Sequence, residues 1–199
     1  MKERPISFNG DMVRAIRDNR KTQTRRLIKP QPFSGATNGE IIDQIGGLLP
    51  GRSLSSMITD AWQCGFVDVA CRYGEIGDRL RVQEEPSIVR EITDIRIERI
   101  QDISEEDAKA EGCYSNEEYA DLAGKENIWP CRVCEGYQAH SAMGIHFGWE
   151  EVDCVICDTP IKRFRELWRS VYGEDNWNQN PWVWVIEFRR VEQQAEAAA

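Results

Sequence analysis

Two pairs of cysteines are the clearest chemical pattern in this sequence. The pairs are "CRVC" and "CVIC", and 19 residues separate them. Two residues between paired cysteines let both thiolates of a tight turn face one ion, and a second such turn completes a tetrahedron of sulfur ligands. Because four protein ligands leave no coordination position for water or substrate, we expect one zinc ion with a structural role. The predicted ligands are Cys131, Cys134, Cys154 and Cys157.

The other cysteines and the two histidines do not extend this pattern. His140 and His146 lie between the pairs and could replace a cysteine as ligand, but four thiolates make them unnecessary. Cys64, Cys71 and Cys113 lack pair spacing and are expected to be core or surface residues. The segment between the pairs has no periodic apolar core, so the metal would supply much of its folding energy.

The second chemical pattern is the basic stretch "NRKTQTRR" at residues 19–26. Lys21 and Thr24 are three residues apart in a predicted tight turn, so an amine and a hydroxyl could converge on one pocket. A lysine with a depressed pKa can deprotonate a hydroxyl or a water, and Arg25 and Arg26 would supply the neighbouring cations. The same groups could instead hold a phosphate without doing chemistry. The predicted phosphate-binding set is Arg20, Lys21, Arg25 and Arg26.

Charge and hydropathy limit the partners. The chain has 199 residues and a net charge of -9, which opposes indiscriminate coating of nucleic acid. Residues 1–33 nevertheless carry nine Lys or Arg against three acids, and a basic face on an acidic body can bind a phosphate locally. No apolar run approaches the roughly 20 residues of a membrane span, and the N-terminus lacks a signal peptide. We therefore expect a cytoplasmic protein with reduced cysteines and no membrane partner.

Periodicity predicts the elements that position these groups. A strand over 4–9 leads into a helix that ends near Asn19, with Met12, Val13 and Ile16 at helical spacing. Further strands are expected around Leu80 and Val82, over 88–100 with a bulge near Thr93, and over 182–191. Helices are expected over 104–112, 115–124 and 158–173, the last capped by Asp158 or Thr159 and stopped by Gly173. Residues 31–70 are expected to form a long loop or excursion.

Strands at both ends of the chain, joined by short helices and long loops, predict an α+β fold. We expect a small mixed β-barrel with flanking helices, built from residues 1–128 and 158–192. A zinc-ribbon-like module would be inserted at 129–157, and 193–199 would form a disordered tail.

Several segments together resemble the ASCH-domain proteins of tailed phages and prophages. The segments are "RPISFNGDMVRAIRDNRKTQTRRLIKPQP", "YGEIGDRLRVQE", "ITDIRIERIQDISEEDAKAEG" and "FRELWRSVYG" with "WNQNPWVWVIEFRRV". They cover most of the chain outside 31–70 and the cysteine segment. The family's hallmark is G-x-K-T-x-T-x-R after the first helix, represented here by "NRKTQTRR" with Asn19 at the usual glycine. ASCH domains are similar to the PUA fold, so the resemblance implies an RNA-associated barrel and a bacterial host.

The resemblance also implies an activity. A small bacterial ASCH member removes the acyl group from 4-acetylcytidine with a lysine, a threonine and a glutamate, which correspond here to Lys21, Thr24 and Glu84. Thr24 would be the nucleophile, Lys21 its base, and Glu84 would orient or protonate the departing nitrogen. Other ASCH proteins are implicated in RNA cleavage. The family's tryptophan-flanked "W-V-R-E-T-W" is replaced here by "RVQEEPSIVRE", so Glu85 could occupy the place of Glu84.

Three functions follow as expectations. The first, which we favour, is a module that binds RNA, a nucleotide or a modified nucleoside in the basic pocket. The second is a hydrolase, either an amidohydrolase on 4-acetylcytidine-like nucleosides or a ribonuclease. The third is a phage accessory protein that binds a host protein. Binding ranks above catalysis because the strand that carries the glutamate is altered, and fold-level analogy says little about reaction type.

Overall fold

The structure is a computed structural model of the whole chain, and it describes residues 1–122, 131, 133–134, 139–143 and 149–191. It divides into two compact units, Met1–Arg99 with Trp182–Ala199, and Ile100–Pro181. The cysteine segment belongs to the second unit, which also contains helices before and after it, and the insertion expected at 129–157 stays a prediction. In the described ranges, no helix has the length and apolarity needed to cross a membrane.

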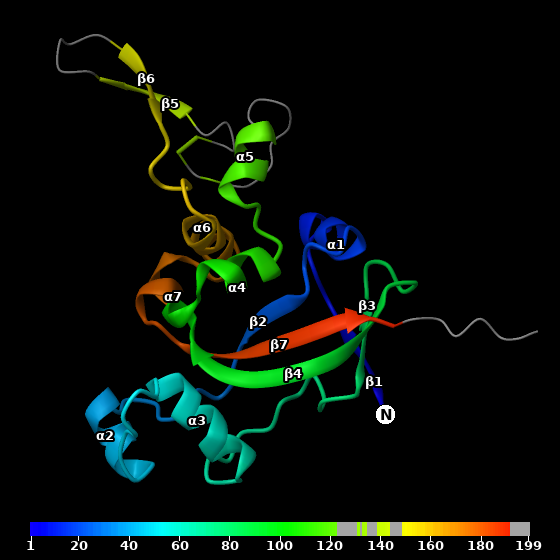
Figure 1. Cartoon of the computed structure of the whole chain (residues 1–199), viewed down its shortest axis with the longest axis vertical. Helices are drawn as coiled ribbons and strands as arrows, with labels where there is room; N and C mark the ends of the chain where they lie inside the picture. The colour runs from blue at the N-terminus through cyan, green and yellow to red at the C-terminus, as the bar shows by residue number, and fades with distance from the viewer. Residues whose placement is uncertain (123–130, 132, 135–138, 144–148, 192–199) are drawn as a thin grey trace, which may run out of the picture. The chain divides into compact units, whose positions relative to one another are not determined.

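The first unit is built on one five-stranded mixed sheet with strand order β1-β3-β4-β7-β2. The strands are β1 Glu3–Ile6, β2 Gln23–Leu27, β3 Arg79–Val82, β4 Val89–Arg99 and β7 Trp182–Arg190. β1 runs parallel to β3, and the other pairs are antiparallel. Figure 1 shows β7 between β4 and β2. The sheet and its helices confirm an α+β fold.

The two edge strands are joined by a side chain. Arg26 of β2 donates from Nη2 to the carbonyl oxygen of Ser7, which follows β1, at 2.6 Å. The sheet therefore curls enough to bring its two edges within reach of one arginine. No backbone pairing of β1 with β2 occurs among the described strands, so closure into a barrel stays a prediction.

Alternation along β4 and β7 sorts apolar from polar side chains. Ile95 pairs with Ile186 and Ile97 with Trp184, and all four are buried in the main core. The register shifts between Ile92 and Asp94, which confirms the bulge predicted near Thr93. The intervening residues lie on the other face of the sheet, where the charged Arg96 and Glu98 of β4 pair with the buried Val185 and Val183 of β7.

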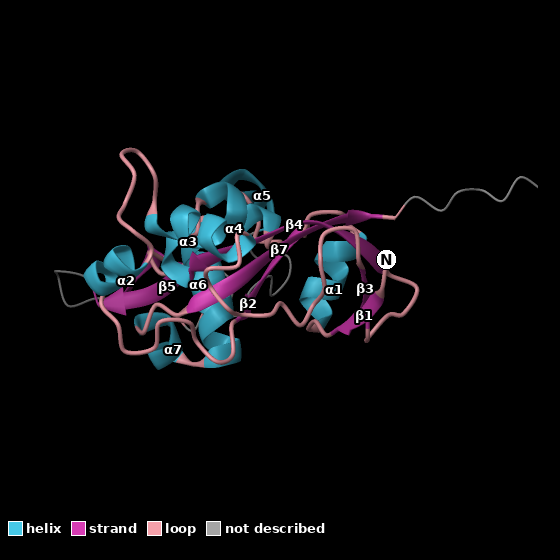
Figure 2. Cartoon of the chain, turned by 90° about the horizontal axis from the view of Figure 1, so that it is seen from below, coloured by secondary structure: helices cyan, strands magenta, loops and turns pink. Residues whose placement is uncertain are grey.

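Helix α1, Gly10–Arg17, positions the start of the basic stretch. Asn9 caps it by accepting a hydrogen bond from the Met12 amide, and Val13 and Ile16 are buried in the core beneath it. Asn19 adopts the left-handed conformation expected at the helix exit, with φ of 58°. Figure 2 shows α1 beside β1 and β3.

Residues 31–70 contain two helices, so the expected long loop is wrong. The helices are α2 Asn38–Gln44 and α3 Leu54–Gln63. Thr37 and Glu40 form a capping box at α2, and Ser53 caps α3. α3 packs on β4 through Thr59, whose hydroxyl donates to the Ile97 carbonyl at 3.0 Å and accepts from the Ile97 amide at 2.9 Å. The capping residues Thr37 and Ser53 are typical of helix starts, but the high Gly and Ser content of the segment favoured the prediction of a loop.

The second unit contains short helices and one hairpin. Its elements are η1 Ile100–Asp102, α4 Glu105–Ala110, α5 Asn116–Leu122, β5 Ala139–Met143, β6 Trp149–Asp153, α6 Pro160–Tyr172 and α7 Glu174–Asn178. The predicted caps are confirmed at Ser104 for α4 and at Thr159 for α6, and Gly173 ends α6. α6 buries Phe164, Leu167 and Trp168 on one face.

Candidate functional site

The basic stretch is largely a strand, which corrects the tight turn expected from the sequence. Lys21 forms an isolated β-bridge through its backbone, and the strand β2 begins at Gln23. Thr24 and Arg26 therefore share one face of the sheet, opposite Ile186 and Trp184 on β7. Arg25 points to the other face because strand side chains alternate.

Arg25 belongs to a charge network on the face of the sheet opposite the main core. Its guanidinium is fully buried and donates to Glu98 at 2.8 Å. Glu98 also accepts from Arg96 at 2.7 Å, and Arg96 reaches Gln23 at 3.1 Å. This internal network separates Arg25 from Arg26, so the two arginines do not form one phosphate cradle. Arg20 lies 3.6 Å from the Asp18 carboxylate.

Arg26 lies in a cluster around the end of β1, which we call the Phe8 site: Ser7, Phe8, Arg26, Tyr73 and Glu84. The Arg26 guanidinium carbon lies 4.8 Å from the Phe8 ring centroid and 6.0 Å from that of Tyr73. Glu84 accepts a hydrogen bond from the Phe8 amide at 3.0 Å and another from the Ser7 hydroxyl. Two aromatic rings, a guanidinium and a carboxylate are thus held together by residues from four segments of the chain.

Lys21 and Thr24 are both buried, with exposed fractions of 1% and 2%. The Lys21 ammonium lies 5.7 Å from the centroid of the Phe8 ring. The same ring therefore meets two cations, Lys21 and Arg26. The catalytic roles implied for Lys21 and Thr24 stay predictions.

The structure places Glu84 and Glu85 in different surroundings. Partial burial raises the pKa of Glu84, but hydrogen bonds from Ser7 and the Phe8 amide and the charge of Arg26 outweigh it, so this pKa lies below its usual value. Glu85 instead pairs with Arg17 at the end of α1. Glu84 is therefore the glutamate that reaches the basic stretch.

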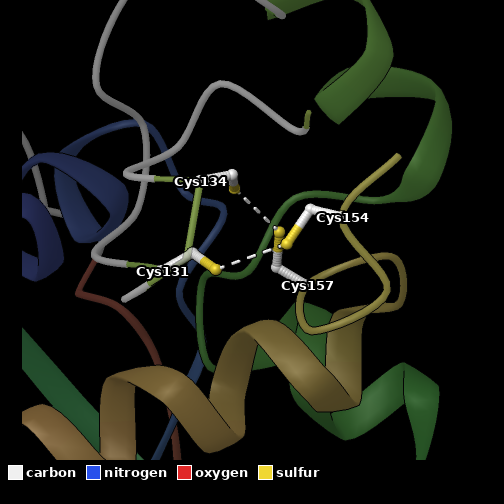
Figure 3. Close-up of side chains that lie close together, drawn as sticks. All are labelled: Cys131, Cys134, Cys154 and Cys157. Atoms are coloured by element: carbon white, nitrogen blue, oxygen red, sulfur yellow. Dashed lines mark hydrogen bonds between the residues drawn. The ribbon is translucent and has the colours of Figure 1, made fainter. Parts of the chain in front are cut away.

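The four predicted cysteine ligands converge in the second unit (Figure 3). Their sulfur atoms all lie within 4.8 Å of one another and are buried. The Cys131–Cys154 and Cys134–Cys157 sulfur distances are 3.7 and 3.4 Å, too long for disulfides. A tetrahedron with metal–sulfur bonds of about 2.3 Å has edges of about 3.8 Å, so this donor set fits a metal ion.

Two buried side chains support the cysteines. The Tyr119 hydroxyl lies 3.4 Å from the Cys157 sulfur, and the Arg163 guanidinium lies 3.9 Å from the Tyr119 ring centroid. Arg163 also donates to the carbonyl oxygens of Cys157 and Tyr114, at 2.9 and 2.7 Å. These bonds fix the second cysteine turn against α6, as hydrogen bonds around metal ligands commonly do.

The remaining cysteines and histidines take no part in this cluster as far as the structure describes them. Cys64 is exposed, and Cys113 is buried, as expected for surface and core residues. Burial raises the pKa of the Cys71 thiol, which disfavours a reactive thiolate. The side chain of His140 and all of His146 lie outside the described residues.

No protein-family model, curated protein or solved structure matches this chain. The resemblance to ASCH-domain proteins therefore stays a prediction.

Sequence reasoning missed the aromatic part of the Phe8 site. Phe8 was read only as a strand residue, and Tyr73 lies 65 residues further along the chain. The available signal was an aromatic residue just after one strand and an arginine near the end of another strand of the same sheet. That signal becomes specific only when strand order is known.

Proposed function

We propose that this protein binds RNA, or a nucleotide or modified nucleoside, at the Phe8 site. The observation that carries the proposal is the Arg26 guanidinium, held against Phe8 and Tyr73 beside the carboxylate of Glu84. Phe8 and Tyr73 are buried, whereas Arg26 is half-buried and Glu84 exposed, so the two charged groups are the ones that meet a ligand.

The two charged groups suit the two ends of a nucleotide. A guanidinium plane can stack on an unpaired base or bind a phosphate through its paired N–H groups. A carboxylate accepts hydrogen bonds from the amino or imino groups of a base edge. The lowered pKa of Glu84 keeps this acceptor ionised at neutral pH. A single-stranded RNA nucleotide presents all of these partners at once.

The test is binding of a fluorescein-labelled single-stranded 12-nucleotide RNA, followed by anisotropy. Arg26→Ala should weaken binding by about tenfold, because stacking on one base is worth about 1–3 kcal/mol. Arg52→Ala is the matched control, since Arg52 pairs with Asp60 on α3 and lies outside the Phe8 site. Equal affinities of the two variants would contradict the proposal.

A second candidate function is removal of an acyl group from an acylated cytidine. The observation that favours it is the burial of Lys21 and Thr24 together, with Lys21 near the ring that Arg26 also contacts. Wild type and Lys21→Ala should be assayed on 4-acetylcytidine and on short RNAs, with products followed by chromatography. Turnover by wild type that Lys21→Ala abolishes would make this the primary function. Equal product from both proteins would exclude Lys21 as the base.

For the cysteine cluster we propose one structural zinc ion. The support is a set of four thiol sulfurs at tetrahedral spacing, a donor set that suits zinc. Burial raises the pKa of the Cys131 thiol to about 11, so metal binding must displace protons. Metal analysis of protein purified without added metal should find about one zinc per chain. Four freely reactive thiols and no metal would refute this assignment.

A further inference from the structure

The first unit also contains a basic groove whose lining includes none of the residues of the Phe8 site. It is a cleft of about 1030 Å³ to which α1, β1, β3, β4 and the end of β7 contribute. We call it the arginine groove, because five arginines line it, Arg17, Arg79, Arg81, Arg90 and Arg190. Glu3 and Glu85 are the acidic residues of its lining. Five positive charges against two negative ones give a local charge of +3, in a chain whose total is -9.

The two glutamates neutralise only two of the arginines. Arg17 pairs with Glu85, and Arg81 donates to Glu3 at 2.6 Å. Both arginines are largely exposed, and such ion pairs contribute at most about 1 kcal/mol. An incoming anion can therefore share or replace these partners at little cost.

Arg90 and Arg190 face each other directly across β4 and β7. Like charges at directly opposed positions of a sheet are destabilising, and no acid pairs with either arginine among the described residues. Arg90 is fixed in place, since it donates to the carbonyl oxygens of Ile16 and Val89 at 2.9 and 3.1 Å. Burial, together with Arg190, lowers the pKa of Arg90. An anion bound between the two guanidinium groups would relieve this repulsion.

Arg79 also lines the groove, from the face of β3 opposite Leu80, the residue that pairs with Arg90. The Nε of Arg79 is buried and has no hydrogen-bond partner in the part of the chain that the structure describes. Buried donors without a partner are uncommon in folded proteins, and an oxygen-rich anion is one species that satisfies them.

We propose that the arginine groove binds consecutive phosphates of the RNA strand whose base is held at the Phe8 site. The groove exceeds the size of a single phosphate site, and guanidinium groups match phosphate oxygens in pairs. The two sites are linked by adjacent residues, because Glu84 belongs to the Phe8 site and Glu85 to the groove. The assignment to RNA rests on the proposed function, whereas the anion site stands on the groove itself.

The RNA experiment compares Arg79→Ala/Arg190→Ala with Arg189→Ala in the anisotropy assay. Arg189 is the matched control, since it is exposed, neighbours Arg190 and bonds Glu91 outside the groove lining. The double variant should bind the 12-nucleotide RNA about tenfold more weakly, and the slope of log affinity against log salt should flatten by about 1.4. Arg190→Ala alone, at an exposed position, should give about half of this change in slope if the double variant does not fold.

Inorganic pyrophosphate separates this inference from the proposed function. It should raise the Tm of wild type and of Arg26→Ala, but not that of Arg190→Ala. If RNA binds wild type and the groove variants alike, the groove proposal fails and the proposed function stands. If RNA does not bind wild type, the RNA assignment fails. A rise in the Tm of wild type with pyrophosphate would then support an anion site alone. If wild type neither binds RNA nor gains Tm with pyrophosphate, both proposals are overturned.

Discussion

At the residue scale, the two adjacent glutamates after β3 illustrate how neighbours in sequence acquire different partners. Glu84 accepts hydrogen bonds at the end of β1, and Glu85 pairs with Arg17 at the end of α1. The first stabilises the Phe8 site, whereas the second reduces the positive charge of the arginine groove. A glutamate-to-glutamine change at either position removes the same single charge, so the pair forms a natural comparison.

We predict opposite effects of these two substitutions on RNA affinity. Glu84→Gln should weaken binding several-fold, because the amide is a poorer acceptor for the base edge and for the Phe8 amide. Glu85→Gln should strengthen it, because Arg17 loses its partner and the groove gains a net positive charge. Fluorescence anisotropy at two salt concentrations measures the RNA affinity of each variant. Changes of the same sign would contradict the separate roles.

Asp78 gives a pH-dependent prediction. Its carboxylate accepts from the backbone amides of Lys2 and Glu75, and the Lys2 bond is the main reason that its pKa lies below 3.8. A depressed folded-state pKa means that the stabilisation is present above the unfolded-state pKa and is lost as pH falls through the folded-state value. Asp78→Asn should therefore lower Tm at pH 7, and its difference from wild type should shrink below about pH 3.8.

The control for that measurement is Asp68→Asn, at an exposed position in the same unit. The Tm of Asp68→Asn should equal that of wild type at pH 7 and at pH 3. A gap between wild type and Asp78→Asn that is equal at pH 7 and pH 3 would rule out the ionised carboxylate as the source of stability.

At the element scale, the main feature is how α3 completes β4. β3 pairs with β4 only from Val89 to Glu91, so the rest of that edge needs other partners. The Thr59 hydroxyl supplies two hydrogen bonds to Ile97, and Trp62 packs edge-on against Trp184 at a centroid distance of 4.9 Å. The segment that the sequence presents as a loop therefore covers a sheet edge and part of the core.

We predict that Thr59→Val destabilises the first unit by about 1–3 kcal/mol, because it leaves a buried amide and carbonyl of β4 without partners. Urea denaturation followed by circular dichroism measures the loss. Thr59→Ser keeps the hydroxyl and should lose less than half as much. Equal losses in the two variants would assign the effect to the methyl group rather than to the hydrogen bonds.

At the scale of the whole molecule, the chain divides its tasks between two units. The first contains the sheet, the Phe8 site and the arginine groove, and the second contains the cysteine cluster and the buried apolar face of α6. The buried cluster there consists of Tyr119 and the four cysteines, whereas Met143 and Trp149 of the hairpin are 63% and 74% exposed. With so little apolar burial nearby, we expect a metal ion bound by the four cysteines to supply much of the order of this region.

We predict that removing the metal loosens the second unit and spares the first. After chelator treatment, hydrogen exchange should accelerate around Tyr119 and at the start of α6, while β4 and β7 keep their protection. Cys154→Ser should reproduce the effect without chelator, and added zinc should reverse it only in the wild-type protein. Unchanged exchange around Tyr119 in metal-free protein would show that the cysteines are not what holds this unit.

Features that depend on local spacing follow from the amino-acid sequence alone. The cysteine pairs, the strand alternation, the bulge near Thr93 and the helix caps at Ser104 and Thr159 follow from patterns a few residues long. Each is set by the chemistry of one turn, or by one period of a helix or strand, so the sequence carries it without knowledge of distant contacts.

Which distant side chains come into contact depends on how the strands assemble into the sheet. Adjacent residues of β2 lie on opposite faces in any register, but the register of β2 on β7 placed Arg26 rather than Arg25 on the face of the main core, and strand order brought Arg26 to Ser7 and Phe8. The arginine groove depends on pairing Arg90 with Arg190, which are 100 residues apart. Such pairings are fixed by the burial of whole strand faces, a property of the assembled sheet that no short segment of the sequence contains.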